Sequence, residues 1–295
     1  MTWTTADIGD QSGRTFLITG ANGGLGEQTA LALGAAGANV ILACRNVASA
    51  EPVAARIGSN ATVSELDLAD LASVRACAER TGPIDVLINN AGVMAIPLKR
   101  TVDGFEMQMG TNHFGHFALT GLLLPKISDR VVTVSSAMHQ MGKINLEDPN
   151  YRQRNYSRWP AYGQSKLANL LFSYELARRL AAAGSPVKSL AAHPGYAATG
   201  LQSHTESVWD RLMVLGNLIA QPAADGALPT LYAATSDQAR SGGFYGPTKL
   251  GGSRGAPGPA KSNKRSRDEL TAAGLWELSE SLTGVRYSVD PASSN

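Results

Sequence analysis

The chain has 295 residues, of which 43% are hydrophobic and 17% charged, and its formal net charge is +2. This apolar content can fill a substantial core and excludes a wholly disordered chain. So small a positive surplus provides no strong attraction to nucleic acid or to an anionic membrane. The cysteines, Cys44 and Cys77, are too few for a disulfide framework or a structural zinc site, so a reduced, cytoplasmic setting is expected.

Neither a leader peptide nor a membrane span is expected from the sequence. Residues 1–14 contain no basic region followed by an apolar run. No stretch of 18 apolar residues occurs anywhere in the chain, so we expect no transmembrane helix.

Short β-branched runs alternate with Ala-rich and Leu-rich stretches. They predict strands at 14–19, 39–44, 61–66, 85–89, 130–135 and 186–191. A first helix is expected at 27–36, and a last one at 268–282 with inward-facing Leu270, Leu275, Trp276 and Leu278. Nearly continuous apolar strands separated by helices predict an α/β fold, a doubly wound parallel sheet (Rossmann-like) in three α/β/α layers. Ligands bind such sheets at the carboxyl ends of the strands.

No linker divides the sequence, so we expect a single domain over residues 1–295. Its cofactor-binding half is expected at about 12–135, and its catalytic and substrate half at about 136–295. Residues 241–267 are rich in Gly, Pro and Ser and are interpreted as a loop with a solvated basic end. Apolar residues between 199 and 219 are spaced as on an amphipathic helix, which either packs on the body or forms a lid or a surface contact.

A glycine-rich turn joins the first strand to the first helix. Glycines let a backbone approach a pyrophosphate closely, and a helix amino terminus adds unpaired N–H groups and a positive dipole end. The spacing differs from G-x-G-x-x-G, so an ordinary strand-to-helix turn is the alternative. The expected contacts in this turn are Gly20, Asn22, Gly23, Gly24, Leu25 and Gly26.

The end of the second strand favours NADP(H) over NAD(H). An NAD site usually carries Asp or Glu there for the ribose 2′-hydroxyl. This chain has Cys44, Arg45 and Asn46 instead, and no acid before Glu51. The Arg45 guanidinium can pair with a 2′-phosphate; a plain surface arginine is the alternative.

Two further strand ends complete the expected cofactor site. Asp67 and Leu68 follow the third strand and are expected to reach the adenine. Asn89, Ala91 and Gly92 end the fourth strand, where small residues leave room for the cofactor.

Tyr162 and Lys166 stand one helical turn apart on the same face of a predicted helix. A tyrosine titrates near 10, and a nearby ammonium favours the phenolate and lowers that pKa. Such a tyrosine can exchange a proton with a carbonyl or alcohol oxygen. The spacing alone is a weak signal, because a surface Tyr and a surface Lys would match it.

Taken together, these motifs resemble the short-chain dehydrogenase/reductase family over nearly the whole chain. The matching residues, in the family's order, are Thr19, Gly20, Gly24, Gly26, Asn89, Asn90, Ala91, Gly92, Asn112, Ser135, Ser136, Tyr162, Lys166, Pro194 and Gly195. Residues 112–117, 162–169 and 193–196 are most similar to the retinol-dehydrogenase-like and protochlorophyllide-reductase-like group.

The resemblance implies a role for each matching side chain. Tyr162 would be the general acid/base, and Lys166 would hold the nicotinamide ribose and lower the Tyr162 pKa. Ser136, rather than its neighbour Ser135, would hydrogen-bond the substrate oxygen. Asn112 would hold a water that links Lys166 to solvent. The residues that would line the nicotinamide carboxamide are Pro194, Gly195 and Thr199.

Two further features are open or discounted. Residues 137–161 are interpreted either as part of a substrate wall or as a surface loop with its own cluster, and they include Met138, Met141, Tyr151, Tyr156 and Trp159. His113 and His116 share a helix face, but no further ligands are placed clearly, so no metal is expected.

The sequence therefore predicts an NADP(H)-dependent oxidoreductase acting on a small-molecule carbonyl/alcohol pair. The closer resemblance and the apolar residues at 201–218 favour a lipophilic aldehyde or ketone. The alternative is an NADP(H)-binding sensor or scaffold without catalysis; a photoenzyme like protochlorophyllide reductase is a third. The resemblance also implies a homodimer formed through the helices around Asn112 and Tyr162.

Overall fold

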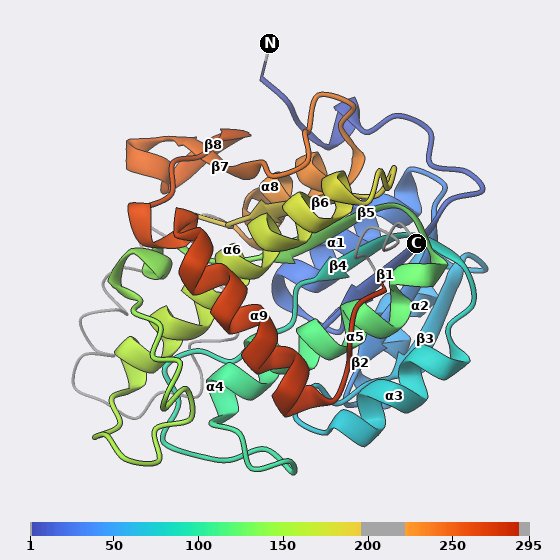
Figure 1. Cartoon of the computed structure of the whole chain (residues 1–295). Helices are drawn as coiled ribbons and strands as arrows, with labels where there is room; N and C mark the ends of the chain where they lie inside the picture. The colour runs from blue at the N-terminus through green and yellow to red at the C-terminus, as the bar shows by residue number, and fades with distance from the viewer. Residues whose placement is uncertain (1, 196–221, 289–295) are drawn as a thin grey trace.

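The computed structural model describes residues 2–195 and 222–288 (Figure 1). Its strands form one eight-stranded sheet in the order β3-β2-β1-β4-β5-β6-β7-β8. The strands are β1 (Thr15–Thr19), β2 (Asn39–Cys44), β3 (Ala61–Glu65), β4 (Ile84–Asn89), β5 (Ile127–Val134), β6 (Lys188–Ala192), β7 (Phe244–Lys249) and β8 (Arg254–Pro259). All neighbouring pairs are parallel except β7 and β8, which are antiparallel. The predicted doubly wound parallel sheet is confirmed, with one antiparallel strand added at its edge.

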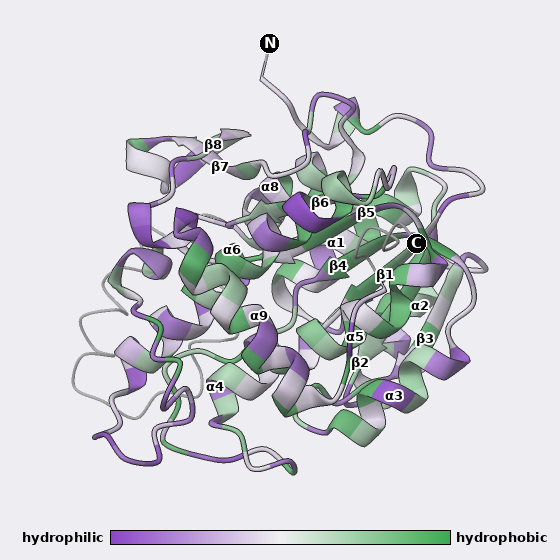
Figure 2. Cartoon of the chain, viewed as in Figure 1, coloured by the Kyte–Doolittle hydropathy of each residue, from purple (hydrophilic) through white to green (hydrophobic). Residues whose placement is uncertain are grey.

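Helices cover both faces of the sheet, which gives the three predicted layers (Figure 1). The helices are α1 (Gly24–Ala35), α2 (Glu51–Ile57), α3 (Leu71–Arg80), α4 (Met107–Met109), α5 (Gly115–Leu123), α6 (Arg158–Ala182), α8 (Ala223–Thr235) and α9 (Glu269–Thr283). Side chains of β1 alternate between two cores: Leu17 packs with α3, α5 and α6, whereas Phe16 and Ile18 pack with α1 and α8. Figure 2 shows the hydrophobic residues concentrated on the central strands and on the helix faces against them.

The interpretation of 241–267 as a loop is wrong, because this region contains β7 and β8. Prolines and glycines in both strands made the sequence look like a loop. In the structure Pro257 of β8 lies opposite Pro247 of β7, and Gly258 lies opposite Gly246. Such residues are depleted in central strands but tolerated at a sheet edge, which is where β8 lies. The basic end is exposed, as expected, and the guanidinium of Arg267 lies 4.0 Å from the centre of the Tyr174 ring.

Helix predictions were correct in place but not in every detail. The first helix begins at Gly24, three residues earlier than expected, because the end of the glycine-rich turn is already helical. The last helix is confirmed at Glu269–Thr283, with Leu275 and Trp276 buried. Leu270, expected to pack inward, is 87% exposed in its first turn. The amphipathic helix expected at 199–219 lies outside the described residues.

Helix α9 covers α5 and α6 on the side away from the sheet (Figure 1). The Trp276 ring stacks on Phe172 of α6 at 5.9 Å and meets Phe117 of α5 edge-on at 5.2 Å. Tyr287, just after α9, donates its hydroxyl to the Phe117 carbonyl at 2.7 Å. The helices through which the resemblance implied a homodimer are therefore packed against this chain's own C-terminal segment.

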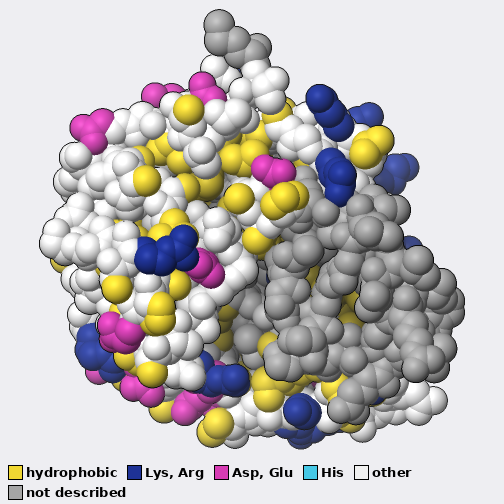
Figure 3. Space-filling view, turned by 180° about the vertical axis from the view of Figure 1, so that it is seen from behind, with side chains coloured by type: hydrophobic (Ala, Val, Ile, Leu, Met, Phe, Trp, Pro, Cys, Tyr) yellow, Lys and Arg dark blue, Asp and Glu magenta, His cyan; other side chains and the backbone are white. Residues whose placement is uncertain are grey.

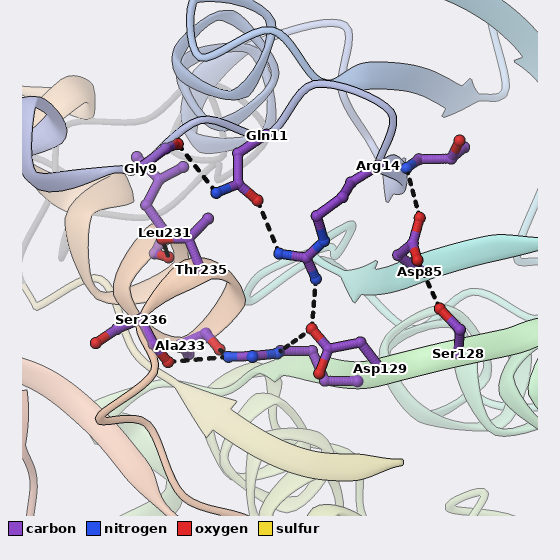
Figure 4. A network of polar contacts seen from close by, with 12 residues as sticks. Gly9, Gln11, Arg14, Asp85, Ser128, Asp129, Leu231, Ala233, Thr235 and Ser236 are labelled. Carbon is purple, nitrogen blue, oxygen red and sulfur yellow. Dashed lines mark hydrogen bonds and ion pairs between the residues drawn. The ribbon is translucent and has the colours of Figure 1, made fainter. Parts of the chain in front are cut away.

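A polar network joins the amino ends of the central strands to α8 (Figure 4). Asp129 accepts from the guanidinium of Arg14 and from Nε of Arg130, the latter at 2.9 Å. The buried Arg130 also donates to the carbonyls of Ala233 and Ser236 at 3.2 and 3.1 Å. These carbonyls belong to the last turn of α8 and its cap, where backbone acceptors lack helical partners. The network thus fixes α8 on the sheet, at the edge opposite to the carboxyl ends of the strands.

The surface matches the nearly balanced charge of the chain. On the face seen from behind, basic and acidic side chains of the described residues are both present, in places next to each other (Figure 3). No helix in the described ranges is long and apolar enough to cross a bilayer.

Candidate active site

A cavity of about 410 Å³ opens at the carboxyl ends of β1, β2, β3 and β4. This is where a doubly wound sheet binds its ligands. The predicted cofactor residues that line it are Gly20, Asn22, Gly23, Gly24, Leu25, Gly26, Arg45, Asn46, Asp67, Leu68, Ala91 and Gly92. The structure therefore brings together residues from four separate segments of the sequence.

The glycine-rich turn has the close packing that a pyrophosphate-binding turn requires. Gly20 has a φ of +67°, a conformation that side chains rarely adopt. A Cβ at Gly26 would lie 2.2 Å from the Gly20 carbonyl oxygen, so only glycine fits there. The first turn of α1, which begins at Gly24, faces the cavity with backbone N–H groups that no earlier helical residue can satisfy. The cradle fits the phosphates of a dinucleotide.

The rim at the end of β2 is polar and carries a cation. Arg45 and Asn46 are exposed there, and both line the cavity. Asn22 donates to the Ser49 hydroxyl at 3.0 Å, and Ser49 donates to the Asn46 carbonyl at 2.6 Å. This network links the glycine-rich turn to the β2 rim. No carboxylate lines the cavity on this strand end among the described residues.

Of the residues predicted at the end of the fourth strand, Asn89 does not reach the cavity. Its side chain is fully buried, and its amide donates to the Thr120 hydroxyl of α5 at 2.9 Å. Strand alternation explains this, because Leu87, two residues earlier, packs on the same face. Its neighbour Asn90 lines the cavity instead.

A buried hydrogen-bond chain that the sequence did not reveal supports the cavity wall. The Thr19 hydroxyl accepts from the backbone N–H groups of Asn90 and Ala91, both at 2.9 Å. The same oxygen lies 2.9 Å from Nε2 of His116, whose Nδ1 lies 3.0 Å from the Asn112 carbonyl oxygen. Burial lowers the His116 pKa to about 4, so the ring is neutral. Since a carbonyl can only accept, Nδ1 carries the proton and Nε2 accepts from Thr19.

Asn112 fixes the strand-end segment from the other side. Its Oδ1 accepts from the Val93 N–H at 2.8 Å, and its Nδ2 donates to the Val93 carbonyl at 2.9 Å. Gly92 lies between Asn112 and Lys166: a Cβ at Gly92 would be 3.0 Å from Asn112 Oδ1 and 3.4 Å from Lys166 Nζ. The lysine amine is therefore beside a residue that lines the cavity.

Tyr162 and Lys166 lie on α6 and are both buried, with exposures of 6% and 4%. The Lys166 amine is 5.8 Å from the centre of the Tyr162 ring and donates to the Val134 carbonyl at 3.1 Å. Ser136 lies close enough to the Tyr162 side chain to lower its pKa, and its hydroxyl accepts from the Met138 N–H at 3.2 Å. Ser135 points elsewhere and donates to the Lys166 carbonyl at 2.7 Å. Of the two neighbouring serines, the structure brings Ser136 to the tyrosine.

The electrostatics of this pair differ from the expectation. Burial raises the pKa of Tyr162 to about 12, and the nearby Ser136 opposes this only in part. Burial also lowers the pKa of Lys166 to about 8. The expected lowering of the Tyr162 pKa by Lys166 is therefore wrong: burial raises this pKa, because a buried phenolate loses its hydration, and Ser136 rather than Lys166 opposes the rise.

The remaining predicted site residues follow β6. Pro194 and Gly195 do not line the cavity at the other strand ends. Gly195 has a φ of +69°, and a Cβ there would lie 2.5 Å from the Ser253 carbonyl oxygen. Its N–H donates to Nδ1 of His193 at 3.3 Å. Thr199 lies outside the described residues.

The cluster within residues 137–161 supports the surface-loop interpretation, and the substrate wall stays a prediction. Trp159 meets the Tyr162 ring edge-on at 6.3 Å. Tyr151 and Tyr156 instead form their own pair, with ring centres 5.2 Å apart, and Met141 is 61% exposed. The segment is thus a surface connection with one ring beside Tyr162.

The histidines of α5 and the preceding π-helical turn (Gly110–Phe114) have structural partners. His113 lies 3.0 Å from the Ser279 hydroxyl, and burial lowers its pKa to about 3. Within residues 2–195 and 222–288, no group of three His, Cys, Asp or Glu side chains is arranged to hold a metal ion.

Comparison with known proteins agrees with this geometry. The family model for short chain dehydrogenases matches residues 14–208. Human retinol dehydrogenase 12 is 40% identical over 290 residues, which cover 93% of this chain and 88% of the relative. A crystal structure of an uncharacterized protein from Mycobacterium Paratuberculosis is 51% identical, with a TM-score of 0.86 over 97% of this chain and 99% of that one.

A more distant structure is the 3-ketoacyl-(acyl-carrier-protein) reductase from Brucella melitensis complexed with NADH. It is 25% identical, with a TM-score of 0.63 over 79% of this chain and 96% of that one. The glycine-rich turn and the cavity lie at the carboxyl ends of the strands, where doubly wound sheets bind dinucleotides. The chain therefore belongs to the short-chain dehydrogenase/reductase family of oxidoreductases.

Proposed function

We propose that this protein is an NADP(H)-dependent enzyme that interconverts a carbonyl compound and an alcohol. The observation that carries the proposal is the Gly92 contact. Gly92 lines the dinucleotide cavity and lies against the Lys166 amine, one helical turn from Tyr162. The proton donor and the dinucleotide cavity are thus adjacent, as hydride and proton transfer to one carbonyl group requires.

The dinucleotide supplies the hydride when it is bound, and the side chains of this chain bind the substrate oxygen and transfer the proton. The Ser136 hydroxyl, which lies near Tyr162, holds the substrate oxygen beside the phenol. Tyr162 donates its proton to that oxygen during reduction and removes it during oxidation. Lys166, whose pKa is lowered to about 8, holds the nicotinamide ribose and exchanges protons near neutral pH. Asn112 links this site to solvent through a water.

NADP(H) is proposed over NAD(H) because of the rim at the end of β2. Arg45 is exposed there, and the cavity lining of that strand end contains no carboxylate in the described residues. A guanidinium stabilises a 2′-phosphate, whereas an NAD site usually offers an acid to the ribose.

A lipophilic aldehyde or ketone is the proposed substrate. The support is the similarity to retinol dehydrogenase 12 and the ring of Trp159 beside Tyr162. Both cysteines are free and buried, which suits a reducing compartment, so we also propose a cytoplasmic setting. We further propose that a single domain holds both halves of the site.

A panel of aldehydes and ketones of increasing chain length, with retinal included, tests the proposal. Oxidation of NADPH is followed by its absorbance, and NADPH binding is measured separately by titration. Turnover that improves with chain length would support the proposed enzyme. Tight NADPH binding without turnover of any compound would favour the sensor or scaffold instead.

A further inference from the structure

Residues 93–96 form a short wall segment directly after Gly92. Val93, Met94 and Ile96 line the dinucleotide cavity, and Ala95 is buried behind them. Ala95 has a φ of +50°, an unfavourable conformation for a residue with a Cβ. The wall segment therefore needs contacts from its surroundings to keep its shape.

Three side chains provide those contacts. Asn112 holds both backbone groups of Val93, as described above. The Gln108 Oε1 accepts from the Ala95 N–H at 2.7 Å, at the strained residue itself. The Tyr156 hydroxyl donates to the Ile96 carbonyl at 2.9 Å, which is nearer than the Glu106 carboxylate at 3.3 Å.

Gln108 connects the wall segment to the catalytic helix. Its side chain is fully buried, and its Nε2 donates to the Tyr156 hydroxyl at 2.9 Å and to the Arg158 carbonyl at 3.0 Å. Arg158 is the first residue of α6, the helix that carries Tyr162. One buried amide thus bonds to the cavity wall and to the start of α6.

We propose that Gln108 and Tyr156 are positioning residues that hold the strained wall segment in its binding-competent shape and in fixed register with α6. This proposal rests on the proposed function, because it assigns a role at the same site. Neither side chain lines the cavity, so each acts through residues 93–96.

The test compares Gln108→Leu and Tyr156→Phe with a matched control, Tyr287→Phe. Tyr287 also donates a buried hydroxyl to a backbone carbonyl, that of Phe117, but on the α9 side of the molecule. Affinity for NADPH is measured by fluorescence titration, and thermal stability is measured alongside. All three variants should lose thermal stability, whereas only the first two should weaken NADPH binding, by about tenfold. Equal NADPH affinity in Tyr156→Phe and Tyr287→Phe would overturn the proposal.

A second change separates positioning from general damage. Glycine adopts positive φ without steric cost, so Ala95→Gly removes part of the strain that Gln108 opposes. Added to Gln108→Leu, it should recover most of the lost NADPH affinity. The absence of recovery would contradict the positioning role. Should Gln108→Leu fail to fold, Tyr156→Phe with and without Ala95→Gly carries the same comparison.

These results are distinct from the fate of the proposed function. NADPH affinity is measured without any substrate, so absence of carbonyl turnover leaves the positioning test intact. Conversely, normal turnover in the unaltered protein together with unchanged affinity in both variants would remove only the positioning role.

Discussion

The hydroxyl of Thr19, at the end of β1, lies 2.9 Å from Nε2 of His116 on α5, 97 positions later in the chain. This bond anchors the loop that lines the cavity, since the same hydroxyl accepts two backbone N–H groups from residues 90 and 91. Replacing Thr19 with Val keeps the shape but leaves these buried groups without their partner.

We expect Thr19→Val to lower the free energy of unfolding by about 2–4 kcal/mol, because several buried polar groups lose a hydrogen bond. Thr19→Ser keeps the hydroxyl and loses one buried methyl group, at a cost of about 1 kcal/mol. Urea denaturation of both variants checks the difference. Equal stability of the two would show that the hydroxyl has no anchoring role.

Tyr162→Phe should abolish turnover while NADPH still binds. Removing a general acid/base lowers kcat by about 10² to 10⁴-fold. The phenyl ring keeps its packing against Trp159, so the affinity for NADPH should stay within about twofold. Steady-state rates and a binding titration on the same preparation check both parts. Turnover at the original rate would refute the assignment of the proton donor.

Arg45→Asp should change the cofactor preference. The carboxylate repels a 2′-phosphate and can accept from a ribose 2′-hydroxyl, so kcat/KM with NADPH should fall about tenfold or more and that with NADH should rise. Arg56→Asp is a suitable control, because Arg56 is also exposed but pairs with Glu27 away from the lining residues. An unchanged ratio in Arg45→Asp would remove this residue from the phosphate site.

Acid should destabilise the protein before its carboxylates titrate. Burial lowers the pKa of His113 to about 3 and those of His116 and His193 to about 4, from an ordinary value of 6.5. The unfolded state then binds more protons below pH 6.5, so stability is full above that pH and falls as the pH drops toward 4. Each histidine contributes a slope of about 1.4 kcal/mol per pH unit.

Denaturation midpoints between pH 7 and pH 4.5 measure this loss. The variant His113→Gln can keep a bond to Ser279 without titrating, so its stability should depend less steeply on pH. A slope that is identical in the variant would show that His113 does not contribute to it.

The C-terminal segment should act in place of a partner subunit on α5 and α6. Trp276 is 2% exposed, and its ring contacts Phe117, Phe172 and Tyr287. Trp276→Ala should therefore lower the free energy of unfolding by about 3–5 kcal/mol, which urea denaturation measures.

Because the C-terminal segment covers α5 and α6, we also expect the protein to be a monomer by light scattering. A stable dimer whose interface includes α5 would contradict this assignment of the surface.

The sequence was most informative where a segment's own pattern decides its structure. The nearly continuous apolar run at 39–44 predicted β2 with the bounds that the structure shows. The i, i+4 spacing correctly placed Tyr162 and Lys166 on one face of a helix. β7 and β8 were missed because a segment rich in Gly and Pro usually forms a turn. Such a segment can form a strand at the edge of a sheet, but the sequence does not show that these residues lie there.

The support of the candidate site was not predictable for a different reason. Gln108 bonds to Ala95 nearby, but also to residues 156 and 158, and nothing in the local pattern selects those partners. The pKa of Tyr162 depends mainly on its burial by the whole fold. The spacing between Tyr162 and Lys166 in the sequence carries no information about that burial. Hydrogen-bond partners that lie far apart in sequence appear only once the topology is known.

The prolines of β8 affect whether this edge of the sheet can pair with a strand of another molecule. The Ala260 N–H donates inward to the Phe244 carbonyl, so by alternation positions 257 and 259 direct their nitrogens to the open side of the sheet. Both are proline and offer no N–H to an approaching strand. This border of the sheet is thereby protected against edge-to-edge aggregation.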